Sequence, residues 1–164
     1  MGAHKQEFPM PFRITGLDPQ PFRRFYGLSD QALSAHGVRR MTVDKMPGFP
    51  ERVELRDLEI GEKALLLNYM HQPADTPYRS SHAVFVREGA DRPADLTDEV
   101  PDVIRRRMIS LRAFSWDGDI LDADVMDGTE IENTISRFFE NSYISYLHAH
   151  YARYGCFAAR ITRD

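Results

Sequence analysis

The sequence predicts an α+β fold in which a largely antiparallel sheet carries three to four packed helices. Predicted strands outnumber predicted helices, and they follow one another through short turns instead of alternating with helices as in a parallel sheet. The 164 residues suit one domain with a full core, and no repeat or linker divides them. We therefore expect residues 1–164 to form a single domain, with residues 1–11 as a flexible N-terminal segment.

The first third of the chain begins with a short strand and two short helices. Phe12–Thr15 has strand character, and Asp18-Pro19 then resembles a helix N-cap with proline at the first helical position. Ser29 is expected to cap a second short helix that ends at Gly37. Apolar and polar residues alternate over 39–44, with Met41 and Val43 on one face, which predicts a strand.

The middle of the chain is rich in predicted strand. A Pro-Gly-Phe-Pro turn leads to a strand over 52–55, and a nearly continuous apolar run over 64–69 is typical of a central strand. Prolines, aspartate and serines over 70–81 predict a loop. Residues 83–86 form the next predicted strand.

The last part of the chain carries the clearest local patterns. A helix is expected through Val103 and the Arg105–Arg107 run, after a polar segment over 91–97. Residues 109–114 and 120–125 flank Asp117-Gly118 and predict a β-hairpin with a two-residue turn.

The strongest helix signal begins after this hairpin. Thr129 and Glu132 have capping-box spacing, and the following helix has an apolar face. That face consists of Ile131, Ile135, Phe138 and Phe139. Two final strands are expected over 144–150 and 157–161.

Composition and charge exclude several classes of protein. The net charge of −4 argues against a nucleic-acid partner, and no apolar run is long enough to cross a membrane. The arginine run at 105–107 is better explained as the cationic end of a helix than as a nucleic-acid contact. A single cysteine and no export signal predict a cytoplasmic location. No nucleotide-cofactor motif is present.

The pair His148-x-His150 is the most specific chemical signal. Residues two apart on a strand point the same way, so both imidazoles are placed to bind one divalent metal ion. His71, His82 or a nearby carboxylate is then needed as the third ligand. The alternative is that both histidines are hydrogen-bonded side chains beside Tyr146.

Cys156 is the candidate nucleophile, because a histidine such as His148 or His150 can approach it across a hairpin. The alternative is a small buried side chain, which is the usual state of a free cysteine. The catalytic candidates are therefore His148, His150 and Cys156.

The predicted loop that runs from His71 to His82 is dense in hydrogen-bond donors. Tyr78 and Arg79 are suited to holding a carboxylate or phosphate, with His71 and His82 at the two ends. The alternative is a surface connection stiffened by two prolines. The ligand-binding candidates are His71, Tyr78, Arg79 and His82.

Several of these segments resemble a known family. They are Leu65–Tyr69, His71–Asp75 with Pro77–Arg79, Phe85–Ala90, and His148-x-His150 with Gly155–Arg160. The chain is similar over Phe12–Arg163 to the bacterial family named domain of unknown function 1203. The resemblance implies a small stand-alone bacterial protein and brings no known activity, substrate or cofactor. It groups His71, Tyr78, Arg79, His148, His150 and Cys156 as one set.

Two functions fit these observations. The first is a small-molecule site, catalytic or not, in which a pocket lined by His, Arg and Tyr binds an anionic ligand, with a divalent metal on His71, His148 and His150. The second is a non-catalytic interaction module that acts as a homodimer. Its surface is expected to use aromatic side chains, namely Phe8, Phe12, Tyr151 and Tyr154.

Overall fold

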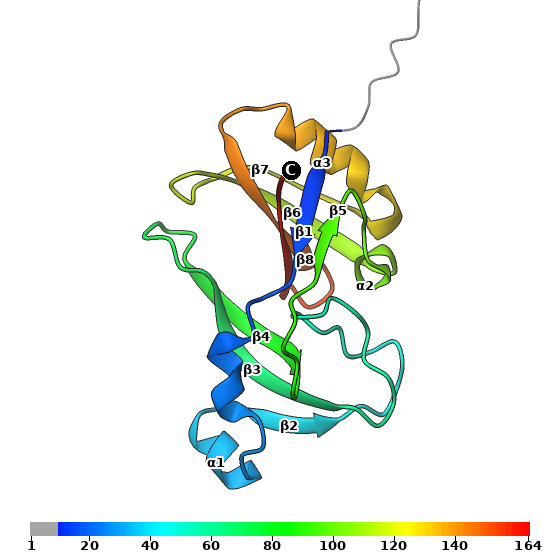
Figure 1. Ribbon diagram of the computed structural model, residues 1–164. Coiled ribbons are helices and arrows are strands. Elements are labelled where there is room, and N and C mark those ends of the chain that lie inside the picture. The colour runs from blue at the N-terminus through cyan, green and yellow to red at the C-terminus, as the bar shows by residue number, and fades with distance from the viewer. Residues whose placement is uncertain (1–9) are drawn as a thin grey trace, which may run out of the picture.

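The computed structural model describes residues 10–164, which form two antiparallel sheets (Figure 1). The larger sheet has the strand order β5-β1-β9-β8-β6-β7, and the smaller has the order β2-β3-β4. Antiparallel pairing, as predicted, joins every pair of neighbouring strands. The prediction of one sheet is wrong, because β2–β4 form a separate one. Residues 1–9 of the predicted flexible segment lie outside the described part of the chain.

The larger sheet is built from the chain's two ends and its second half. Its strands are β1 (Phe12–Thr15), β5 (Asp95–Thr97), β6 (Met108–Ser115), β7 (Ile120–Asp127), β8 (Ile144–Tyr151) and β9 (Phe157–Arg163). The predicted β6–β7 hairpin is present, but its turn is longer than the predicted two residues. Ser115 pairs with Asp119 across the loop, and Gly118 has the positive φ of 88° that this turn requires. β5 was not predicted, because its three residues give no readable alternation.

Helix α3 (Ile131–Phe139) covers one face of this sheet and buries its predicted apolar side. The predicted capping box is wrong in its residues. Asp127 caps the preceding turn η2 (Gly128–Glu130) by accepting the backbone N–H of Thr129 at 3.0 Å. Glu132 instead forms an ion pair with Arg105, the last residue of α2 (Asp102–Arg105), because both oxygens of its carboxylate accept hydrogen bonds from that guanidinium.

The smaller sheet packs against the N-terminal helices. β2 (Arg39–Thr42), β3 (Lys63–Gln72) and β4 (Ser80–Arg87) form it, with β3 in the centre as predicted. One face is covered by η1 (Gln20–Phe25) and α1 (Asp30–Ala35) through Phe22, Phe25 and Leu33. Ser29 caps α1 as predicted and accepts the N–H of Ala32 at 3.1 Å.

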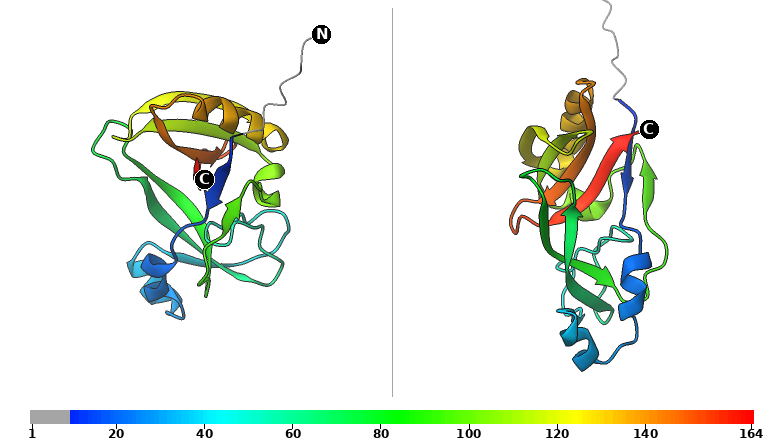
Figure 2. Two further views of the ribbon diagram at one scale, coloured as in Figure 1. Left: turned by 45° about the horizontal axis from the view of Figure 1, so that its top comes forward. Right: turned by 90° about the vertical axis from the view of Figure 1, so that its left-hand side faces the viewer.

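The predicted loop over 70–81 is shorter than expected. β3 continues through Gln72 and β4 begins at Ser80, so a long hairpin extends from the small sheet towards the large one (Figure 2). Thr76 donates to the carbonyl of Gly118 at 3.2 Å, and Gln72 donates to the hydroxyl of Tyr146 at 2.9 Å. These contacts attach the hairpin to the turn of β6–β7 and to β8.

The strand predicted over 52–55 is absent. The buried Glu51 carboxylate accepts the backbone N–H groups of Val53 and Glu54, which bends the chain into a turn. Leu55 has a φ of 53°, outside the strand region. A carboxylate that binds the backbone locally therefore overrides the apolar pattern here. None of the helices within residues 10–164 has the length and apolarity needed to cross a membrane.

Candidate functional site

Three histidines from the two sheets meet in a buried cluster. His148 and His150 lie on one face of β8, as their spacing predicts, and His71 comes from the end of β3. One ring nitrogen of each lies within 4.8 Å of the others. The exposed fractions are 8% for His71, 3% for His148 and 1% for His150. The structure thus brings together the three residues named as metal ligands.

Two local irregularities place these rings. The β3–β4 register shifts between Tyr69 and Gln72, at His71, and the β8–β9 register shifts between Ala149 and His150. The second shift sets Phe157 opposite His150. The Phe157 ring then stacks on His71, with centroids 5.5 Å apart, and meets His148 edge-on at 5.0 Å.

Each imidazole of the cluster keeps a buried nitrogen without a hydrogen-bond partner among the described residues. These atoms are Nδ1 of His71, Nδ1 of His148 and Nε2 of His150. The other nitrogen of His150 lies 3.0 Å from the carbonyl oxygen of Gly155, so Nδ1 carries the proton and Nε2 presents a lone pair. An unpaired buried polar atom costs about 1–3 kcal/mol, so three together make the cluster a candidate ligand-binding site.

Burial also keeps the three rings neutral. It lowers the pKa of His71 to about 4, with the charge of Arg112 contributing. It lowers the pKa of His148 to about 2 and that of His150 to about 3. At neutral pH the cluster therefore offers neutral imidazoles, each with one lone-pair nitrogen, which is the form that binds metal ions.

Two arginines flank His148 on its own face of the sheet. Arg112 on β6 and Arg160 on β9 are its cross-strand partners. Arg160 lies over the ring of Tyr146 at 4.2 Å. No carboxylate in the described part of the chain pairs with either arginine, and burial lowers the pKa of Arg112. Sequence reasoning missed both, although their register opposite β8 places them beside the histidines.

Tyr78 and Arg79 lie on the exposed tip of the β3–β4 hairpin. Arg79 donates to the carbonyl oxygen of Pro73 at 2.6 Å, a contact within the tip itself. Both side chains are outside the histidine cluster. His82 is partly buried, with Nδ1 3.2 Å from the carbonyl oxygen of Ala83, and lines a separate cavity. The structure therefore distributes the predicted ligand-binding residues over three places.

Cys156 lies in that separate cavity and contacts an arginine. Its Sγ lies 3.0 Å from Nη2 of Arg52, a buried side chain. The predicted contact with His148 or His150 is replaced by this one with Arg52, and neither of these histidines lines the cavity that Cys156 lines. The cavity has a volume of about 790 Å³.

Within residues 10–164, the aromatic residues expected of an interaction module do not form one exposed patch. Phe12 and Tyr151 are both 3% exposed, whereas Tyr154 is 81% exposed. Phe12 and Tyr151 belong to the core of the larger sheet, so they cannot form a surface with Tyr154. Phe8 lies outside the described residues.

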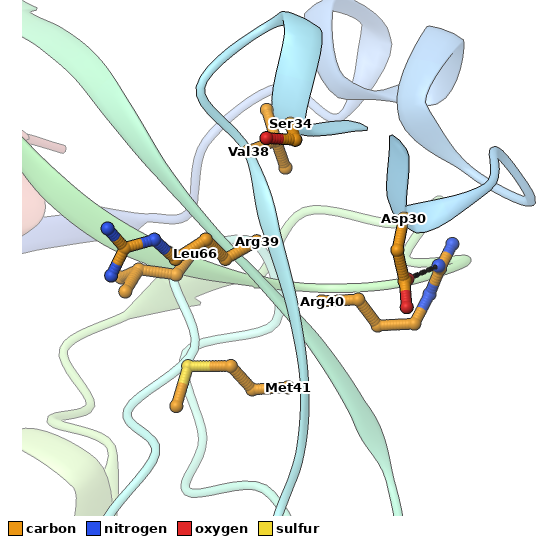
Figure 3. Close-up of a pocket in the computed structure, with 7 residues that line it drawn as sticks. All are labelled: Asp30, Ser34, Val38, Arg39, Arg40, Met41 and Leu66. Carbon is orange, nitrogen blue, oxygen red and sulfur yellow. Dashed lines mark hydrogen bonds and ion pairs between the residues drawn. The ribbon is translucent and has the colours of Figure 1, made fainter. Parts of the chain in front are cut away.

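A second hollow of about 420 Å³ lies beside β2 and α1 (Figure 3). Arg40 is among its lining residues and is paired with Asp30 at 2.6 Å (Figure 3) and with Glu88 at 2.7 Å. Arg40 also donates to the carbonyl of Leu28 at 2.6 Å. These contacts join α1 to the smaller sheet and pair the charge of Arg40, which indicates a structural role for Arg40.

Comparison with known proteins identifies the family. A family model described as "Protein of unknown function (DUF1203)" matches residues 48–163. The chain belongs to this family. Over residues 48–163 the match confirms the resemblance seen in the sequence, and this range contains every residue of the histidine cluster and Cys156. No curated protein and no solved structure matches the chain. In this DUF1203 protein, the two candidate sites are the histidine cluster and the cavity that holds Cys156.

Proposed function

We propose that this DUF1203 protein binds a divalent transition-metal ion through His71, His148 and His150. The observation that carries the proposal is the convergence, within 4.8 Å, of nitrogens from three buried imidazoles that each keep an unpaired nitrogen. An ion with bonds of about 2.0–2.1 Å needs ligand atoms at most about 4.2 Å apart. Binding therefore requires only a small approach of the rings.

The donor set points to a class of ion. Imidazole ligands suit zinc, copper, iron and nickel, whereas magnesium and calcium prefer oxygen ligands. The hydrogen bond between His150 Nδ1 and Gly155 supports this reading, because a metal-binding histidine usually donates its other N–H to a fixed acceptor. Three protein ligands leave a coordination position for water or substrate, as in catalytic zinc sites.

The flanking arginines suggest what completes the site. Arg112 and Arg160 add positive charge beside a cation, which is unfavourable unless an anion is also present. A small carboxylate or phosphate ligand satisfies both, because guanidinium groups bind these anions through paired hydrogen bonds. We therefore extend the proposal to a small anionic ligand beside the metal, which would act there as a Lewis acid. This replaces Arg79 with Arg112 as the expected anion ligand.

The test is the metal content of protein purified without a histidine tag. Plasma mass spectrometry is expected to find about one equivalent of metal per chain, either as purified or after incubation with zinc, iron and nickel. His148→Ala and His71→Asn should each remove it, whereas His36→Ala should not, because His36 is exposed and outside the cluster. Circular dichroism checks that each variant is folded. A folded wild type that takes up no metal after these incubations would refute the proposal.

The anionic ligand is tested separately in metal-loaded protein. Phosphate and acetate are expected to bind with an affinity that Arg112→Met reduces about tenfold, while the metal content stays near one equivalent. Arg137→Met is the matched control, since Arg137 is an exposed arginine paired with Asp124 on the other side of the sheet. Equal affinities in the wild type and Arg112→Met would remove Arg112 from the proposal and leave the metal site intact.

A further inference from the structure

The cavity that holds Cys156 is distinct from the histidine cluster. None of the three clustered histidines lines it. Its walls come from the loop over 45–52, from strands β2, β3 and β4, and from the segments after α2 and β8. The volume of about 790 Å³ falls within the range typical of small-molecule sites.

The charged side chains of this cavity all have one sign. Five cationic residues line it and no carboxylate does; the cations are Lys45, Arg52, Arg106, Arg107 and Arg153. Asp57, directly behind the wall, pairs with Arg106 at 2.8 Å and with Arg107 at 2.6 Å. Asp102 also lies 4.0 Å from Arg106. Even with Asp57 and Asp102 counted, the balance at the cavity is three positive charges, in a chain whose net charge is −4.

Two buried polar side chains line the cavity, one without a hydrogen bond and one without a carboxylate partner. The hydroxyl of Tyr151 is buried and makes no hydrogen bond within residues 10–164, and Tyr151 is 3% exposed. Arg52 is 1% exposed and donates to the carbonyls of Phe157 and Pro50 and to Cys156 Sγ, but to no carboxylate. A buried guanidinium without a counter-charge is costly, so an anion that enters the cavity would be stabilised there.

The remaining wall is apolar and suits an apolar part of the ligand. Met41, Pro47, Phe49, Leu66 and Phe85 line the side formed by the smaller sheet and its loop. A site with one apolar wall and one cationic end suits a molecule with an apolar body and an anionic head.

We propose that this cavity binds a small organic anion, with a carboxylate or phosphate head held by Arg52, Arg153 and Tyr151 and an apolar body against Phe49, Leu66 and Phe85. Cys156 then lies beside the head group. The site is independent of the metal proposal, because it shares no side chain with the histidine cluster.

Titration calorimetry with phenyl phosphate and benzoate as probes tests this proposal, with benzyl alcohol as the neutral comparison. At least one anion is expected to bind one site per chain with a Kd below about 1 mM, and benzyl alcohol should bind at least tenfold more weakly. Comparing the two anions shows which head group is preferred. Arg153→Ala and Tyr151→Phe should each weaken binding several-fold, and Arg153→Lys should restore part of it. Arg137→Ala is the control arginine variant.

Alkylation of Cys156 locates the bound probe, because this is the chain's one cysteine. The anion is expected to slow the reaction of Cys156 with iodoacetamide, and the anion concentration that gives half of this protection should equal the Kd from calorimetry. If the thiol does not react in the folded protein, loss of binding in Tyr151→Phe locates the site instead. The proposal is overturned if neither anion binds below about 1 mM, or if binding is unchanged in both Arg153→Ala and Tyr151→Phe.

Discussion

The ring of Phe157 lies parallel to that of His71, with centroids 5.5 Å apart and planes inclined by 5°. The backbone carbonyl of the same Phe157 accepts a hydrogen bond from Nε of Arg52 at 2.8 Å. One residue therefore closes the histidine cluster with its side chain and helps to hold the base of the cationic cavity with its backbone. The two sites lie back to back across the start of β9.

Truncation of this ring should loosen the cluster while leaving the backbone contact in place. Phe157→Ala is expected to lower the free energy of unfolding by about 3–5 kcal/mol, because a fully buried aromatic ring is lost. Phe157→Leu keeps most of the volume and should cost less. Urea unfolding measures both, and metal affinity in Phe157→Leu is expected to fall because the His71 ring loses its stacking surface. A cost below about 1 kcal/mol for Phe157→Ala would contradict this packing.

Acid should destabilise the metal-free protein through its three buried histidines. Their folded pKa values of about 4, 2 and 3 lie below the unfolded value of 6.5. At pH values between the folded and unfolded pKa values, the unfolded chain binds more protons than the folded one. The histidines therefore do not reduce the free energy of unfolding above pH 6.5, and they reduce it increasingly as the pH falls below 6.5. At pH 5 each histidine costs about 2 kcal/mol, since one pKa unit corresponds to about 1.4 kcal/mol.

Urea unfolding at pH 7.5 and pH 5.0, with a chelator present, measures this loss. His148→Phe is expected to lose about one third of the pH dependence, whereas His36→Ala should retain all of it. A wild type equally stable at both pH values would show that at pH 5.0 the three rings are protonated in the folded protein as they are in the unfolded chain.

The buried carboxylate of Asp57 should be critical for the fold around α2. Its side chain is 0% exposed and pairs with both Arg106 and Arg107. Asp57→Ala leaves Arg107 without a counter-charge and Arg106 with only the exposed Asp102 at 4.0 Å, and it is expected to cost about 3 kcal/mol or more. Arg106→Ala should cost less, because Arg106 is 41% exposed and Arg107 still neutralises Asp57. Chemical denaturation of the two variants checks the order; equal costs would contradict it.

Gly128 should not tolerate a side chain. A Cβ at this position would lie 2.0 Å from the carbonyl oxygen of Ile104 and 2.8 Å from that of Arg107, both of them backbone atoms. Gly128→Ala is therefore expected to lower the free energy of unfolding by more than about 2 kcal/mol, because the backbone at Ile104 and Arg107 must move away from η2. Gly37→Ala is the comparison: its φ is 71° and no atom lies within 4 Å, so only the conformational cost of about 1 kcal/mol applies. Thermal unfolding distinguishes the two.

Several features were determined by the sequence alone because their signals are local. The spacing of His148 and His150 placed both rings on one face of β8, as strand geometry requires. The apolar spacing of α3 and the presence of the β6–β7 hairpin were confirmed in the same way. Each of these depends on backbone periodicity or on a glycine conformation, which a short window of sequence contains.

The tertiary structure alone decided which distant residues meet. Bulges in β3 and β9 bring His71 to His148, and the register of β6 and β9 sets Arg112 and Arg160 beside them. The turn at Glu51 puts Arg52 against Cys156, more than one hundred residues away. Separation in sequence carries no signal for such contacts, because they depend on how the two sheets pack. The sequence therefore supplied the histidines, and packing determined that they form a cluster distinct from the cationic cavity.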